Sequence, residues 1–130
     1  MKGSPFYFGD VPRFCTSDDF VAELPEVITT KTQLLEAYYE LLQFPEYFGF
    51  NWDAMDECLG DLEWIENRRV IIVHKALPDL EHSQLKVYLD VLAYCIRRWE
   101  KDEAHVVIVA FPEKLEQVVN SLLESRPDYT

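Results

Sequence analysis

Apolar residues along the chain form two kinds of pattern, continuous runs and helical stripes. The β-branched runs Arg69–His74 and His105–Phe111 are typical of strands buried on both faces. Strands of this kind occur in parallel sheets, where a long crossover, usually a helix, joins one strand to the next. The shorter run Phe20–Leu24, closed by Pro25, indicates a further strand. The pattern therefore predicts an α/β domain with a small parallel sheet of about three strands.

Apolar residues spaced three and four positions apart predict helices around these strands. Thr29 or Thr30 can cap the first helix and Ser83 the crossover helix, because their hydroxyls accept hydrogen bonds from free N–H groups. The expected helices cover Lys31–Gln43, Trp52 to about Leu62, Ser83 to about Trp99, and a last segment built on Leu115, Val118, Val119 and Leu122. Residues 1–19 are expected to form an arm or an extra strand. Residues 20–130 are expected to form one domain with an added C-terminal helix.

The second of these helices is strongly acidic. Residues 44–63 hold six acidic side chains and no Lys or Arg. At 100° per residue the helix separates into two faces. The apolar face carries Met55, Cys58, Leu59 and Leu62, and the polar face carries Asp53, Asp56, Glu57 and Gly60. Neighbouring carboxylates repel one another and the helix contains no cation, so a basic partner would relieve the repulsion.

An aromatic loop, Pro45–Phe50, precedes the acidic helix. Gly49 is expected to give this loop a positive-φ turn and to allow another molecule to approach its backbone closely. Asn51 can cap the helix, and Asp53 lies where a helix N-terminus favours an anion. Trp52 is either an interface anchor or a residue that folds back onto the core, and the sequence leaves both open. Aromatic groups beside acids indicate a protein-binding face.

The loop and the acidic helix together carry a family resemblance. The run Pro45-Glu46-Tyr47-Phe48-Gly49, followed by Asn51, Asp53, Ala54, Cys58 and Leu59, resembles the signature of the barstar family, intracellular inhibitors of secreted ribonucleases. The resemblance implies a barstar-like three-layer fold over about residues 20 to 111, in which the acidic helix and the loop before it plug the ribonuclease active site. It implies partner-binding roles for Tyr47, Gly49, Asn51, Trp52, Asp53, Asp56, Glu57 and Gly60.

The chain also departs from the family pattern. At the central anchor position the family's best-known member has Asp, whereas this chain has Glu57, which is one methylene longer. The aromatic residue that precedes the anchor is here Asp56. These departures imply a different cognate enzyme. A further acidic contact of the family aligns without gaps on Arg98 and, with a two-residue shift, on Glu100.

The charge balance of the whole chain favours a basic partner. Its 130 residues include 24 acidic and 12 basic side chains, for a formal net charge of −12. Such a surface repels phosphate, so direct binding of nucleic acid is not expected, while long-range attraction favours a cationic protein. The expected partner is a basic extracellular ribonuclease or a related toxin, bound one to one. The free protein is expected to be a monomer without a cofactor.

The number of cysteines and the hydropathy of the chain indicate the cellular compartment in which the protein is expected. The three cysteines are odd in number and suit neither a disulfide framework nor a Cys-x-x-Cys site, which indicates a reducing cytoplasm. The chain has no apolar run of signal length and no run of 18 apolar residues. Neither export by a standard signal nor a membrane span is therefore expected.

Several residues that can carry chemistry are expected to be structural. Cys58, Cys95 and Trp99 lie on apolar stripes and are expected in the core. No metal site is expected, because no ligand spacing relates the histidines His74, His82 and His105.

Two other classes of function stay open. A hydrolase would use Asp53 with Glu57, or Asp56 with Asp61, as general acid and base. A protein of the same fold can also act as an immunity protein against a toxin that is not a ribonuclease. Acidic groups four residues apart on a helix usually form a solvated face, and the family resemblance favours binding, so we expect an inhibitor and not an enzyme.

Overall fold

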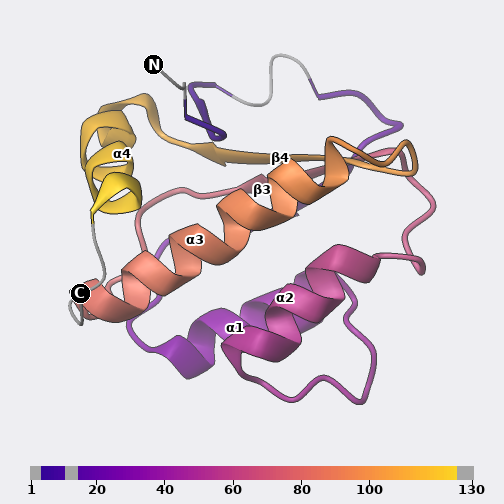
Figure 1. Cartoon of the computed structure of the whole chain (residues 1–130), viewed down its shortest axis with the longest axis horizontal. Coiled ribbons are helices and arrows are strands. Elements are labelled where there is room, and N and C mark those ends of the chain that lie inside the picture. The colour runs from indigo at the N-terminus through magenta and orange to yellow at the C-terminus, as the bar shows by residue number, and fades with distance from the viewer. Residues whose placement is uncertain (1–3, 11–14, 126–130) are drawn as a thin grey trace.

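The computed structural model describes residues 4–10 and 15–125, and these residues contain one parallel sheet (Figure 1). The strands lie in the order β1-β4-β3-β2, where β1 is Tyr7–Phe8, β2 is Phe20–Glu23, β3 is Arg69–Val73 and β4 is Val106–Phe111. The helices are α1 (Lys31–Leu41), α2 (Trp52–Asp61), α3 (His82–Trp99) and α4 (Glu116–Glu124), with the short 3-10 helix η2 (Glu113–Leu115) before the last. The predicted α/β class is confirmed. The sheet has four strands where about three were expected, because β1 adds to the outer edge of β4.

Alternate residues of the central strand β3 serve two different faces of the sheet. Val70 and Ile72 are fully buried in the main core on the helical side. Ile71 is equally buried on the opposite face, where it forms a small cluster with Ala110 against which Cys15 packs. Both faces of the strand are therefore covered, which is why its sequence is a continuous apolar run.

Helix α3 lies between the sheet and α2. It packs against β4 on one side and against α2 on the other, and Figure 1 shows α1 and α2 beyond it. The end of α2 is fastened to α3, because the carbonyl of Leu59 accepts hydrogen bonds from Trp99 Nε1 (2.7 Å) and Cys95 Sγ (3.6 Å). Trp99, Cys95 and Cys58 are all buried, as their positions on apolar stripes predict.

A chain of hydrogen bonds between polar side chains crosses the core. His74 Nδ1 lies 3.0 Å from the carbonyl of Ala110 and therefore donates to it. Burial lowers the pKa of His74 to about 4, so the neutral ring accepts from the Tyr88 hydroxyl through Nε2 (2.7 Å). The Tyr88 oxygen in turn accepts from the hydroxyl of Tyr38. Protonation of His74 would reverse the direction of these bonds and leave the hydroxyl hydrogen of Tyr38 without an acceptor in this chain.

Helix boundaries differ in detail from the sequence-based expectation. Thr30 caps α1 by accepting a hydrogen bond from the N–H of Gln33 (3.1 Å), and α1 ends at Leu41, before Gln43 with its φ of 57°. The prediction that Ser83 caps α3 is wrong. The N-cap residue lies two positions earlier, at Glu81, whose side chain makes no capping hydrogen bond.

Of the four residues on which the sequence builds the last helical segment, Leu115, Val119 and Leu122 pack against the core and Val118 does not. Val119 is fully buried and Lys86 of α3 donates to the carbonyl of Leu123 (2.7 Å), whereas Val118 is exposed. Among the described residues no helix combines the length and the apolar character that crossing a membrane requires.

Candidate partner-binding site

Helix α2 presents one face to the core and the other to solvent. The carbonyl oxygen of the Asn51 side chain accepts a hydrogen bond from the N–H of Ala54 (2.8 Å), which fixes the start of the helix as predicted. The helix ends at Asp61, and the capping residue Leu62 adopts the left-handed conformation with φ of 47°. Met55 and Leu59 are fully buried. The packing of these residues sets the rotation of the helix and so the direction of its acidic face.

Three carboxylates form an exposed row along α2. Asp53, Glu57 and Asp61 are all exposed and lie four residues apart, so they follow one another on the same helix face at intervals of roughly 6 Å along the axis. We call these three residues the acidic row. Asp61 was not among the sequence-predicted partner-binding residues. Its spacing of four residues from Glu57 is the sequence signal that would have found it.

Asp56, beside the acidic row, contacts a cation from another helix. Arg98 of α3 donates through Nη2 to the backbone carbonyl of Asp56 (2.9 Å), and the same nitrogen lies 3.7 Å from its Oδ1. The guanidinium also lies over the ring of Tyr94, 4.8 Å from its centroid. The repulsion expected from an acidic helix without a cation is therefore partly offset from outside that helix.

Gly60 makes room for this cation. A Cβ at Gly60 would lie 2.2 Å from Nη2 of Arg98, so the guanidinium occupies the space that a larger residue would fill. Of the two residues onto which the further family contact can be aligned, Arg98 is thus the one that contacts α2. Glu100 lies at the C-terminal cap of α3 and lines a groove beside β4.

The loop before α2 is held by aromatic packing. Phe48 is buried, and its ring centroid lies 4.9 Å from that of Phe44, 4.7 Å from that of Phe50 and 6.1 Å from that of Tyr39 on α1. We call Tyr39, Phe44, Phe48 and Phe50 the aromatic clasp. Tyr47, between two of its members, is 76% exposed. The clasp therefore fixes the path of the loop and leaves the Tyr47 ring free of it.

The positive-φ turn of this loop is not at Gly49. The residue in the left-handed region is Phe50, with φ of 51°, so the prediction for Gly49 is wrong. A bulky residue adopts this conformation at a cost, and the contacts of the Phe50 ring with Phe48 and Tyr39 offset it. Gly49 has another use, because a Cβ there would lie only 3.2 Å from Nδ2 of Asn51, which donates to the Gly49 carbonyl (3.3 Å).

Tyr47 lies beside the C-terminal half of the acidic row. The pKa of its hydroxyl is raised, first by partial desolvation and then by nearby acidic groups that include Asp61 and Glu57. The exposed Tyr47 ring and the exposed carboxylates of the row are therefore near enough for the acidic groups to act on its hydroxyl.

Trp52, for which the sequence left two roles open, folds back between helices. Its indole N–H donates to Oε1 of Gln84 on α3 (2.8 Å), and its ring centroid lies 6.0 Å from that of Tyr88. Lys31 of α1 lies over the ring, 5.3 Å from its centroid. These contacts favour the packing role, although the side chain stays partly exposed.

The described residues offer no alternative metal chemistry. His74 and His105 are buried, and His105 bonds through its ring nitrogens to the carbonyls of Asn67 (2.8 Å) and Leu62 (3.1 Å). Within residues 4–10 and 15–125 no three His, Cys, Asp or Glu side chains lie close enough together to hold a metal ion.

Comparison with known proteins decides the family. The family model described as barstar, the barnase inhibitor, matches residues 20–111. The chain belongs to the barstar family. The match runs from the start of β2 to the end of β4, so it includes the loop and α2 but not β1 or α4. A search of curated proteins and a search of solved structures gave no significant match.

Proposed function

We propose that this protein inhibits a basic ribonuclease by covering its active site with α2 and the loop before it. The proposal rests on one observation, the acidic row of Asp53, Glu57 and Asp61 exposed beside Tyr47 on a fixed scaffold. The barstar family, whose model is described as that of a barnase inhibitor, includes both of these elements in its matched range.

The proposed mechanism is occlusion. An active site that binds RNA presents Arg, Lys and His side chains to phosphates, and carboxylates held in a row can pair with those side chains in place of phosphate. Because the row lies on a helix whose other face is packed into the core, little conformational entropy is lost on binding. No step of covalent chemistry is required, so the protein itself would not turn over RNA.

In this proposal the residues that the family resemblance assigns to partner binding have two different roles, contact and support. Asp53, Glu57 and Tyr47 are exposed and are the proposed contacts. Asn51 and Gly49 support the loop and the start of α2, Trp52 joins the helices, and Gly60 admits Arg98 to Asp56. In this proposal the second group acts mainly by holding the first in place.

We further propose that inhibition takes place in the cytoplasm of the producing cell, as a one-to-one complex with a chain that is otherwise monomeric. The three cysteines Cys15, Cys58 and Cys95 are free, which suits a reducing compartment. The net charge of −12 favours rapid capture of a cationic enzyme there.

The proposal is tested by titrating barnase, a basic ribonuclease, with the purified protein while RNA cleavage is followed. With barnase we expect a loss of activity that grows with the concentration of the protein, and with the cognate enzyme a loss that is complete at one equivalent. Glu57→Gln should raise the concentration of the protein that is needed for inhibition. Glu116→Gln, a substitution at an exposed position of α4, should leave that concentration unchanged. Since the cognate enzyme is expected to differ from barnase, the same titration is repeated with any basic protein that copurifies. A stable complex with a toxin that leaves RNA cleavage unaffected would replace the ribonuclease with another target.

A further inference from the structure

The outer edge of β4 is paired along only part of its length. β1 pairs with Ala110 and Phe111, whereas β4 begins four residues earlier, at Val106. On the inner edge β3 pairs with all residues from Val106 to Ala110. Among the described residues no strand pairs with Val106–Val109 on the outer edge. The sheet therefore ends in an unpaired stretch of roughly 13 Å.

Ser4, Pro5 and Phe6, the described residues before β1, form no strand on this edge. The chain bends at Pro5 and Phe6, and the N–H of Phe6 is held by the side-chain oxygen of Ser4 (3.2 Å). Phe6 is buried with its ring against Phe111, 5.3 Å between centroids. Pro5 has no N–H to donate to a neighbouring strand. The bend closes one end of the unpaired stretch, and no other described residue pairs with the rest of it.

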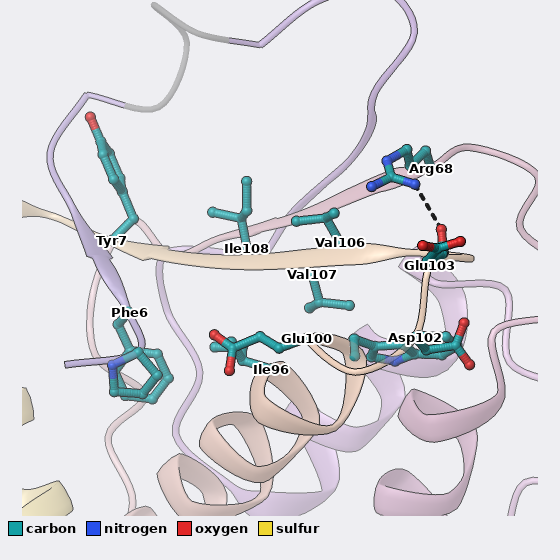
Figure 2. Close-up of a pocket in the computed structure, with 12 residues that line it drawn as sticks. Phe6, Tyr7, Arg68, Ile96, Glu100, Asp102, Glu103, Val106, Val107 and Ile108 are labelled. Atoms are coloured by element: carbon teal, nitrogen blue, oxygen red, sulfur yellow. Dashed lines mark hydrogen bonds between the residues drawn. The ribbon is translucent and has the colours of Figure 1, made fainter. Parts of the chain in front are cut away.

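A groove of about 570 Å³ follows the unpaired edge (Figure 2). Figure 2 shows Val106 and Ile108 on one side of β4 and Val107 on the side of α3. The last turn of α3 contributes Ile96 and Trp99 to the lining, and its C-terminal cap contributes Glu100. At the far end the groove is bounded by Arg68, which donates to the carbonyl of Glu103 (2.7 Å).

The backbone of β4 is oriented to accept a further strand. In a parallel strand the N–H and C=O of one residue point to the same edge, and successive residues alternate. The backbone carbonyl of Phe111 faces the outer edge, because it accepts a hydrogen bond from the N–H of Gly9. The backbone carbonyl of Ala110 faces the inner edge, because it accepts one from the N–H of His74. By this alternation Val107 presents its N–H and C=O to the groove.

The side chains around the groove differ on its two walls. One wall is apolar and includes Val106, which is 37% exposed, and Ile108. The other wall and the mouth carry three carboxylates, those of Glu100, Asp102 and Glu103, against the single guanidinium of Arg68. A strand added here would turn alternate side chains to the two walls. An apolar residue would fit the first wall and a basic residue the second.

We infer that the outer edge of β4 binds an extended segment of a basic protein, in which Lys or Arg alternates with apolar residues, by addition of a strand to the sheet. Backbone bonds to Val107 supply the attachment and the carboxylates supply the preference for cations. This surface is separate from the acidic row, because α3 lies between β4 and α2. A second copy of the chain is a poorer occupant, since each copy would bring three carboxylates to the same edge.

The probe for this site is a blocked eight-residue peptide that alternates Lys and Val, added to the full chain and followed by NMR. We expect chemical-shift changes along Val106–Val109 and slower hydrogen exchange at the amide of Val107. A second peptide of the same sequence carries N-methyl groups on alternate residues, which keeps its charge but removes the donors of one edge. Its binding is expected to be weaker by about tenfold or more, because strand addition depends on those bonds.

Charge-reversed variants test the preference for cations. Glu100→Lys with Glu103→Lys should weaken the binding of the alternating peptide by about tenfold or more. Asp102 is left intact, because its carboxylate accepts from the N–H of Ala104 (2.8 Å) in the turn before β4. Glu113→Lys with Glu116→Lys, which change the net charge equally at exposed positions away from the groove, should leave binding unchanged.

Each other result would overturn the inference. Equal binding of both peptides, or equal weakening by both double variants, would mean that a general negative field attracts the peptide. Absence of binding would mean that the carboxylates only protect an open edge from aggregation. Dimerisation of the free chain with protection of the Val107 amide would assign the edge to a second copy.

Discussion

The backbone of Gly60 on α2 lies directly against the guanidinium of Arg98 on α3. No side chain fits between them, since a Cβ at Gly60 would stand 2.2 Å from Nη2. The contact links the helix that carries the acidic row to the helix that crosses from β3 to β4. It also holds the guanidinium against Asp56, whose carboxylate lies 3.7 Å from Nη2 and stays partly exposed.

This relationship predicts strong coupling between two substitutions. Arg98→Met should lower the free energy of unfolding by about 1 kcal/mol through the lost bond to Asp56, a low value because the side chain is a third exposed. In a Gly60→Ala background the added methyl group displaces the guanidinium, and Arg98→Met should then cost much less. Urea denaturation of the four proteins measures the difference. Additive effects would mean that Arg98 reaches Asp56 equally well past an alanine.

The acidic row predicts a separation of binding from stability. Asp53→Ala and Glu57→Ala should each weaken the proposed complex by about 2 kcal/mol or more and leave the fold intact, because central charged anchors have effects of this size. Calorimetric titration and thermal unfolding measure the two quantities. Met55→Ala is the matched control on the buried face and should instead cost about 2 to 5 kcal/mol of stability. An unfolded Glu57→Ala variant would show that the helix faces are assigned wrongly.

The net charge predicts how salt affects association. The on-rate with a cationic enzyme should fall steeply as the Debye length shrinks from about 30 Å at 0.01 M to about 10 Å at 0.1 M. Neutralising the exposed residues Glu63 and Glu66 should reduce the on-rate and its dependence on salt, whereas Glu57→Gln should mainly raise the off-rate. Stopped-flow mixing across a salt series resolves both rates. If the on-rate does not depend on salt concentration, we would infer that Tyr47 and the aromatic loop, and not the acidic residues, recognise the partner.

The buried hydrogen bonds that join Tyr38, Tyr88, His74 and Ala110 predict that the stability of the fold falls in acid. The pKa of His74 is lowered to about 4 in the folded protein, against about 6.5 unfolded, so above pH 6.5 both states are neutral and His74 adds no pH dependence. Below that the unfolded state binds a proton first, and stability falls by roughly 3 kcal/mol by pH 4. His74→Gln should be less stable at pH 7 but should lose this contribution between pH 6.5 and 4. Urea midpoints across this range give the comparison, and parallel curves would mean that other groups cause the loss.

Local patterns in the sequence predict most of the framework that carries the site. The continuous runs give β3 and β4, and the stripe of Met55, Cys58 and Leu59 gives both the position and the rotation of α2. Packing of side chains next to one another along the chain produces these features, so their signal is local.

Features that depend on distant residues were not predictable in this way. Arg98 reaches Asp56 across 42 positions of the sequence, and no periodic pattern relates the two. β1 has two residues, too few to show an alternation. The left-handed turn falls on Phe50 and not on Gly49 because ring packing in the aromatic clasp selects the backbone conformation there.

The aromatic clasp divides the loop into positions that are free to change and positions that are not. Phe48 and Phe44 are buried in contact with each other, so a smaller residue at either site would loosen the whole loop. Tyr47 stands outside these contacts, and its replacement would alter what the loop displays without altering its course. A new target preference can therefore evolve by single substitutions at Tyr47, and the packing that holds the loop need not change for each new target protein.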